Sequence, residues 1–156
     1  VGHSTSDAVR RHLDPEPRVR LGLALAEAAI PTAMIDISDG LVADLGHILR
    51  LSGIGGVVNL ADLPLSREYR ELGGRYGADP YALCLGGGED YELLFTLPEA
   101  RLAEARALGS AADAPITVVG EIAAETGVCL VAPDGSRYEA RASGYDHFRR
   151  SVRVQD

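Results

Sequence analysis

The sequence predicts an α+β domain in which a mixed β-sheet is packed with helices. Apolar runs of strand length interleave irregularly with stretches of helical periodicity. Two short runs near the C-terminus flank Pro133-Asp134-Gly135, a turn signal that indicates an antiparallel hairpin. The chain has 156 residues with 46% hydrophobic content, which is enough to bury one core. We therefore expect one globular α+β domain.

The chain begins with a segment that gives no helix or strand signal. Residues 1–16 are polar and charged, so we expect a linker or tag-like segment there and the domain in residues 17–156. A helix is predicted from Arg18, ended by Pro31. Its arginines are expected to face solvent, and its core face is expected to consist of Val19, Leu23, Ala26 and Ile30.

A buried strand over Ala33–Ile37 and a helix over about Asp39–Leu51 are predicted next. In the strand, period-two alternation places Asp36 on the same side as Met34 and Ser38. We therefore expect Asp36 to emerge from a face that is otherwise core, where a carboxylate requires a partner.

The junction between this strand and helix concentrates polar side chains. Ser38 or Asp39 is expected to cap the helix, and Gly40 to let a ligand approach its first turn. A helix N-terminus favours phosphate whereas two carboxylates repel it, so the combination predicts a divalent cation between them. The alternative is an ordinary N-cap in which Asp39 only complements the helix dipole.

The remainder of this helix has features that we assign to packing. Gly46 costs about 1 kcal/mol relative to Ala in a helix interior, so close packing is the expected reason for it. His47 is interpreted as a packing or capping residue rather than a base. Gly53 is expected at the helix C-cap, followed by a strand over Val57–Leu60; this order of elements is the reverse of a dinucleotide-binding fingerprint.

A second polar loop follows two short helices, one capped by Ser66 and one opened by Asp79-Pro80. The run Gly86-Gly87-Gly88-Glu89-Asp90 precedes a strand over Tyr91–Leu97, and its glycines permit unusual backbone conformations. A turn with solvated acids is the alternative to a binding loop. Glu92 alternates onto a different face and is expected to be structural.

The elements that follow have no chemical signature and are assigned to scaffold. They are a helix over Pro98–Leu108 with Leu102, Ala105 and Leu108 inward, a strand over Ile116–Ile122, and a hairpin of Val128–Val131 and Arg137–Ala140.

Charge and composition exclude several classes of function. The formal net charge is −8 and there is no basic tract, which argues against binding to nucleic acid or an anionic membrane. All fifteen basic residues are Arg, which excludes the P-loop lysine, the protein-kinase lysine and Schiff-base chemistry. Cys84 and Cys129 have no paired spacing and no targeting or membrane segment is evident, so we expect a cytoplasmic protein with reduced thiols.

Three motifs in order resemble a known family over about residues 17–148. They are Asp36-Ile37-Ser38-Asp39-Gly40-Leu41, Gly87-Gly88-Glu89-Asp90-Tyr91-Glu92-Leu93-Leu94-Phe95 and Gly144-Tyr145-Asp146-His147-Phe148. Together they resemble the C-terminal domain of the thiamine-monophosphate kinases, within the aminoimidazole ribonucleotide synthetase-like superfamily.

The resemblance implies an activity and a set of ligands. The implied reaction is ATP- and Mg²⁺-dependent phosphorylation of thiamine monophosphate to thiamine diphosphate by direct in-line transfer, with no residue assigned as catalytic. Asp36 and Asp39 would hold Mg²⁺, Ser38 would contact ATP, and Glu89 and Tyr145 would hold the substrate, with Asp90 as a second choice to Glu89.

The resemblance also implies a missing part and leaves two alternatives open. The family has an N-terminal domain that binds nucleotide and forms a homodimer, so we expect this chain to be incomplete and inactive alone. One alternative is a sister ATP-dependent synthetase of the same superfamily with a different acceptor pocket. The other is a non-catalytic phosphate- or metal-binding module.

Overall fold

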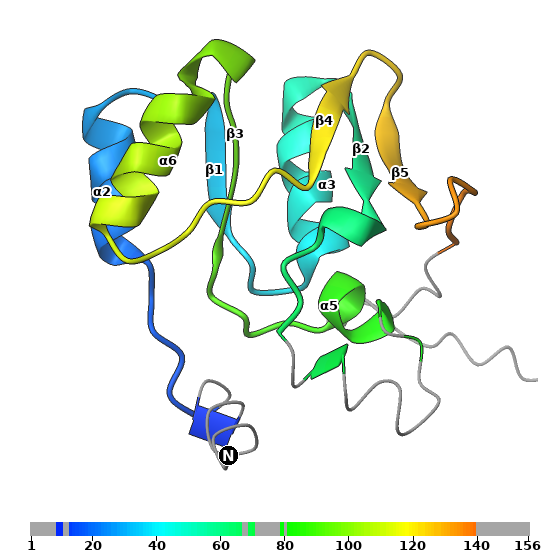
Figure 1. The fold of residues 1–156 in the computed structure, drawn as a ribbon. Coiled ribbons are helices and arrows are strands. Elements are labelled where there is room, and N and C mark those ends of the chain that lie inside the picture. Colours follow the sequence, from blue (N-terminus) through cyan, green and yellow to red (C-terminus); the bar gives the residue numbers. More distant parts are fainter. Residues whose placement is uncertain (1–8, 11–12, 67–68, 71–78, 80, 140–156) are drawn as a thin grey trace, which may run out of the picture.

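The computed structural model describes residues 9–10, 13–66, 69–70, 79 and 81–139 (Figure 1). Its five strands are β1 (Ala33–Asp36), β2 (Gly55–Asn59), β3 (Leu93–Thr96), β4 (Gly120–Ala123) and β5 (Gly127–Val131). β1 and β3 form an antiparallel ribbon, and the other three form a sheet in the order β4-β2-β5. Because β2 is antiparallel to β4 and parallel to β5, the predicted mixed sheet is confirmed.

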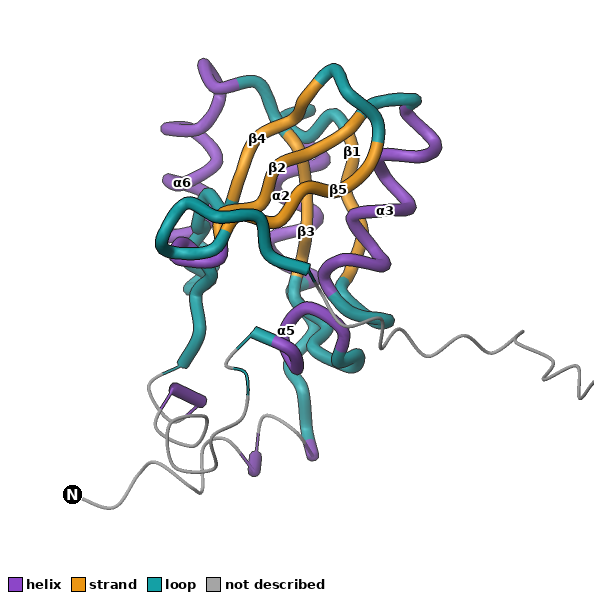
Figure 2. The backbone as a smooth tube through the Cα atoms, turned by 90° about the vertical axis from the view of Figure 1, so that its right-hand side faces the viewer, coloured by secondary structure: helices purple, strands orange, loops and turns teal. Residues whose placement is uncertain are grey.

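Helices pack on both sheets. They are α2 (Val19–Glu27), α3 (Leu41–Ser52), α5 (Ala82–Gly86) and α6 (Leu102–Ala111), with 3₁₀ turns η1 (Leu60–Asp62) and η2 (Glu99–Arg101). α2 and α6 lie side by side against the β1–β3 ribbon, and α3 contacts both sheets (Figures 1 and 2). None of the helices in the described ranges has the length and apolar character needed to cross a membrane.

The β1–β3 ribbon is held between two apolar clusters. Leu93 and Phe95 pack against the cluster that contains Leu25 from α2, whereas Leu94 packs against the cluster that contains Leu49 from α3. This follows from the alternation of successive side chains along a strand. Burial of each large apolar side chain contributes about 1.5–3 kcal/mol, so packing on both faces fixes the end of the ribbon from which the polar loops emerge.

The predicted core face of α2 is wrong. Val19 and Leu23 are 61% and 59% exposed, whereas Leu21 and Leu25 are 4% and 0% exposed. Both pairs are spaced four residues apart, so each forms a valid apolar stripe on a helix. The packing of α2 against the ribbon and α6 selects the second stripe, and that contact lies outside local sequence information. Ile30 is buried as predicted, just beyond the helix.

Several boundaries differ from the predictions. The strand expected over Ile116–Ile122 is confined to Gly120–Ala123, because pairing with β2 begins where Gly120 lies opposite Val58. A side chain at Gly120 would place its Cβ 1.9 Å from the Val57 carbonyl oxygen. The turn at Pro133-Asp134-Gly135 is confirmed, since Asp134 accepts the Ser136 N–H, but the returning strand is reduced to one bridge between Val131 and Arg137.

The expectation that close packing explains Gly46 is also wrong, and this leads to a stability prediction. A Cβ placed on Gly46 would meet no atom within 4 Å. Gly46→Ala is therefore expected to stabilise the protein by up to about 1 kcal/mol through helix propensity, and to raise its Tm by roughly 2–4 °C. Denaturant unfolding of both proteins measures the difference. A loss of stability would contradict the open surroundings of this position.

Candidate functional site

The loop between β1 and α3 follows the exposed Asp36, which is the last residue of β1, and ends at Gly40. The prediction that Ser38 or Asp39 caps α3 is wrong, because Gly40 holds the N-cap position and no side-chain cap is formed there. Gly40 has φ +110°, and a Cβ on it would lie 3.0 Å from backbone atoms of Gly86. Glycine is therefore needed here for both the turn and the close approach of the end of α5.

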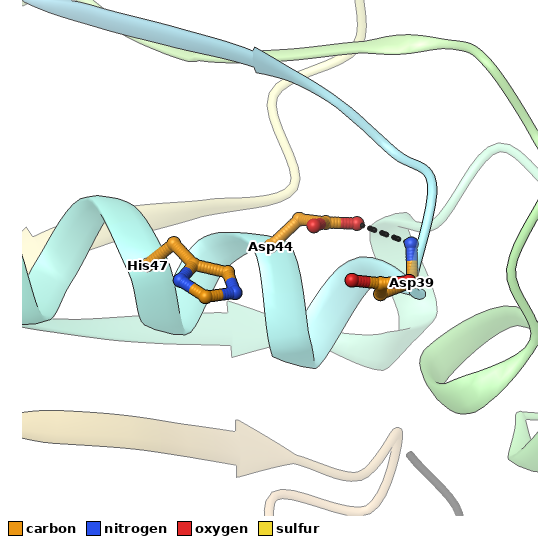
Figure 3. Close-up of side chains that lie close together, drawn as sticks. All are labelled: Asp39, Asp44 and His47. Atoms are coloured by element: carbon orange, nitrogen blue, oxygen red, sulfur yellow. Dashed lines mark hydrogen bonds between the residues drawn. The ribbon is translucent and has the colours of Figure 1, made fainter. Parts of the chain in front are cut away.

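In place of a side-chain cap, Asp44 from the first turn of α3 stabilises this loop. Its side chain is buried, with 2% exposure, and its Oδ2 accepts a hydrogen bond from the backbone N–H of Ser38 at 2.9 Å. The same oxygen accepts a second one from the backbone N–H of Asp39 at 3.0 Å (Figure 3). A carboxylate in the first helical turn is favoured by the helix dipole, and the two N–H donors compensate for its burial.

A role for Asp44 was not predicted from the sequence, although a signal for one exists. Asp44 lies three residues after Leu41 and four before Ile48, both of which are buried. A carboxylate on the apolar stripe of a helix requires hydrogen-bond donors. The loop that precedes the helix is the nearest source of free backbone N–H groups.

The glycine-acidic loop pairs with the β1–α3 loop through the backbone. Glu89 N–H donates to the Ser38 carbonyl and Tyr91 N–H to the Ile37 carbonyl, both at 2.9 Å. A Cβ on Gly88 would lie 2.2 Å from the Ser38 carbonyl oxygen, so only glycine permits this contact. We call residues 36–40 and 86–92 together the loop junction. Two of the three sequence motifs therefore meet in space.

The glycine-acidic loop holds two residues other than glycine in the left-handed region. Glu89 has φ +68° and Tyr91 has φ +51°. Each such conformation costs of order 1 kcal/mol or more and persists only where the surroundings impose it. Here the backbone pairing to residues 37 and 38 imposes it. Such strain is concentrated at functional sites, and Glu89 and Asp90 are exposed, so both carboxylates are accessible to a ligand.

The loop junction places the predicted site residues as follows. Asp36, Asp39 and Glu89 are exposed, and Ser38 is half-buried. The expectation that Asp36 emerges from a core face is wrong, because Met34 on the same side of β1 is also exposed. The carboxylate therefore has solvent, rather than a buried partner, around it. Tyr145 lies outside the described residues, as do the other residues of the third motif.

One group of possible metal ligands is present in the described part of the chain. Ligand atoms of Asp39, Asp44 and His47 lie within 4.8 Å of one another (Figure 3). His47 Nδ1 accepts a hydrogen bond from Arg50 at 2.7 Å, and Asp44 Oδ2 is engaged with the loop amides. Mg²⁺ prefers oxygen ligands and is usually held by one or two carboxylates with waters and phosphates. Asp36 and Asp39 both offer exposed carboxylate oxygens, the ligand type that Mg²⁺ prefers, but Asp36 is not a member of this group.

Glu92 has the structural role that the sequence predicted. It forms a two-point ion pair with Arg18, with Nε to Oε2 at 2.9 Å and Nη2 to Oε1 at 2.7 Å. The pair ties the start of α2 to the residue that precedes β3, so Arg18 is not simply part of a solvated face as expected. A bidentate Arg–carboxylate pair fixes orientation as well as distance.

Asp90 supplies a pH-dependent prediction. Partial desolvation in the loop raises the pKa of Asp90 above its ordinary value of 3.8, and the Glu92 carboxylate raises it further. The folded state then binds the proton more tightly than the unfolded state, so stability falls as the pH rises through this range. Asp90→Asn should therefore be more stable than the wild type at pH 7 and equal to it near pH 3, as measured by urea unfolding. An equal gain at both pH values would contradict the pKa shift as its cause.

The sequence and the fold place this chain in a known family of proteins. The family model described as "AIR synthase related protein, C-terminal domain" matches residues 2–132, and the chain belongs to this family. Within it, the predicted resemblance to the thiamine-monophosphate kinases is confirmed. The thiamine-monophosphate kinase of Escherichia coli O157:H7 is 42% identical over 144 residues, which are 90% of this chain and 42% of that protein.

Two solved structures extend the comparison. The thiamine-monophosphate kinase from Stenotrophomonas maltophilia K279a has a TM-score of 0.75 and 39% identity, covering 88% of this chain and 42% of that one. A structure described as "AaThiL complexed with AMPPCP and TMP" has a TM-score of 0.75 and 32% identity, covering 95% and 43%. The chain thus spans about two fifths of the length of these relatives.

Proposed function

We propose that this chain is the C-terminal part of a kinase that transfers a phosphoryl group from ATP to thiamine monophosphate and forms thiamine diphosphate. Its relatives at about 40% identity are thiamine-monophosphate kinases, and one similar structure was obtained with AMPPCP and TMP. The chain spans less than half of those proteins, so we propose that residues 17–156 form the C-terminal domain and that turnover requires the remaining length.

The observation that carries this proposal is the loop junction. The hydrogen bonds from Glu89 and Tyr91 to the loop of residues 37 and 38 set the proposed substrate-binding loop directly beside the proposed metal-binding loop. In-line phosphoryl transfer requires donor and acceptor phosphates to be aligned within a few ångströms. A junction formed by backbone hydrogen bonds provides a fixed separation for that alignment.

Each predicted site residue then has a role. Asp36 and Asp39 hold Mg²⁺ through exposed carboxylates, and Ser38 contacts ATP with its hydroxyl. When bound, Mg²⁺ supplies neutralisation of the polyphosphate charge. The Glu89 carboxylate accepts from the aminopyrimidine and complements the thiazolium charge, and Tyr145 stacks on the ring, worth about 0.5–2 kcal/mol. These residues bind and orient, because in-line transfer needs no nucleophilic side chain.

The test uses a full-length protein. By this we mean a protein that contains this chain and also a segment equivalent to the part of its relatives that this chain does not cover. We expect the full-length protein to form thiamine diphosphate from thiamine monophosphate and ATP, and we expect this chain alone to show no turnover. Chromatography of the reaction mixture measures the product. Calorimetry with Mg·AMPPCP and with thiamine monophosphate separates the alternatives. Tight nucleotide binding without any response to thiamine monophosphate favours a sister synthetase. Ligand binding without turnover in the full-length protein favours a non-catalytic module.

A further inference from the structure

Asp44 is the one buried charged side chain in the described part of the chain, and the proposed ligand set does not include it. Its Oδ2 accepts hydrogen bonds from the backbone N–H groups of Ser38 and Asp39 in the preceding loop. No side chain at the N-cap of α3 forms a capping hydrogen bond. The positions of Ser38 and Asp39, the proposed ATP and Mg²⁺ ligands, therefore depend on the Asp44 carboxylate in the first turn of α3.

These hydrogen bonds have a second consequence. Backbone N–H groups at a strand-to-helix junction are ordinarily the groups that bind phosphate. At Ser38 and Asp39 those groups point inward to a carboxylate, so they are occupied and lie beside a negative charge. A free polyphosphate thus finds acidic side chains at this loop and loses two of its amide donors. A cation bound by the outward carboxylates then becomes a principal point of attachment, beside the first-turn N–H groups of α3.

We propose that Asp44 is a positioning residue that makes this loop selective for a metal-complexed polyphosphate over the metal-free one. It does so by holding the Ser38 and Asp39 amides inward, which leaves the side chains of the loop to face the ligand. This inference rests on the proposed function for the identity of the ligand. It requires no contact between Asp44 and the nucleotide.

Two substitutions separate position from charge. Asp44→Ala removes the acceptor, and Asp44→Asn keeps an oxygen that can accept both amides while removing the charge. Calorimetry on the full-length protein measures binding of Mg·AMPPCP, of AMPPCP with EDTA, and of thiamine monophosphate. We expect Asp44→Ala to weaken Mg·AMPPCP binding by about 10- to 100-fold, the range for residues that orient metal ligands. Metal-free AMPPCP should bind at least as tightly as it does to the wild type, because the two freed amides can now reach its phosphates. Thiamine monophosphate binding should change by less than about threefold, and Asp44→Asn should restore most of the lost Mg·AMPPCP affinity.

Three results would overturn the inference: unchanged Mg·AMPPCP binding in Asp44→Ala, an equal loss for all three ligands, or an Asp44→Asn protein as defective as Asp44→Ala. An equal loss would mean general damage to the fold, and failure of rescue would mean that the charge itself is what matters.

Amide hydrogen exchange of this chain gives a readout independent of any ligand. The Ser38 and Asp39 amides should exchange slowly in the wild type and in Asp44→Asn, and fast in Asp44→Ala. Fast exchange in the wild type would overturn the positioning role. A wild-type full-length protein that exchanges slowly yet binds no Mg·AMPPCP would overturn the proposed function and the selectivity, while the positioning of the loop by Asp44 would stand.

Discussion

Changing both Asp36 and Asp39 to Asn in the full-length protein is expected to slow phosphoryl transfer by about 10²–10³-fold or more. Both carboxylates are exposed at the loop junction, and asparagine keeps their size while removing the charge that attracts a divalent cation. The loss should appear in kcat and in the Mg²⁺ dependence of the rate. The Tm should change little, because neither carboxylate is buried.

A matched control removes the same charge elsewhere. Asp62 and Glu121 are also exposed, on η1 and β4, and neither belongs to the loop junction. The double variant Asp62→Asn, Glu121→Gln should keep wild-type turnover and Mg²⁺ dependence. If both double variants lost activity to the same extent, net charge rather than a local cation site would be responsible. If neither did, the metal assignment to Asp36 and Asp39 would be wrong.

The second large effect is expected from Gly88→Ala. The added Cβ would lie 2.2 Å from the Ser38 carbonyl oxygen and 3.4 Å from the Asp39 Cα, so backbone must move. Separation of the two loops breaks the hydrogen bond from Glu89 N–H and costs about 1–3 kcal/mol of unfolding free energy. Because we propose that the junction aligns both ligands, binding of Mg·AMPPCP and of thiamine monophosphate should weaken together.

Gly46→Ala is the control for this change, since it adds the same methyl group to open space. Urea unfolding should give opposite signs for the two variants, with Gly88→Ala destabilised and Gly46→Ala stabilised. Full stability together with unaltered ligand affinities in Gly88→Ala would show that the two loops do not need to touch.

Structural features that are set by residues close together in the chain were predictable from the sequence. The αL conformation of Gly53 at the end of α3, the Asp134 turn and the strand alternation around Leu93 to Phe95 each depend on neighbours in the chain. The mixed sheet was predicted from a hairpin among interleaved helices, but its antiparallel pair is β2 with β4, and that hairpin is reduced to one bridge. The motifs were recognised because residue type and spacing, rather than contacts, carry the resemblance.

Features that depend on tertiary contacts were not predictable in the same way. The buried stripe of α2, for example, is chosen by contacts with the ribbon and α6. The use of Asp44 in place of a side-chain cap on α3 is a local feature, but it has an unusual spacing. A side chain that accepts from residues five and six positions earlier has no standard capping pattern. The meeting of Gly88 with Ser38 depends on the pairing of β1 with β3, which brings distant motifs together.

Anomalous scattering from Mn²⁺ in crystals of the full-length protein with AMPPCP and thiamine monophosphate tests the central claim most directly. We expect a manganese peak at about 2.0–2.3 Å from carboxylate oxygens of Asp36 and Asp39, with the thiamine ring on the Glu89 side of the loop junction. A metal held elsewhere, with these two carboxylates in solvent and the ring away from Glu89, would contradict it.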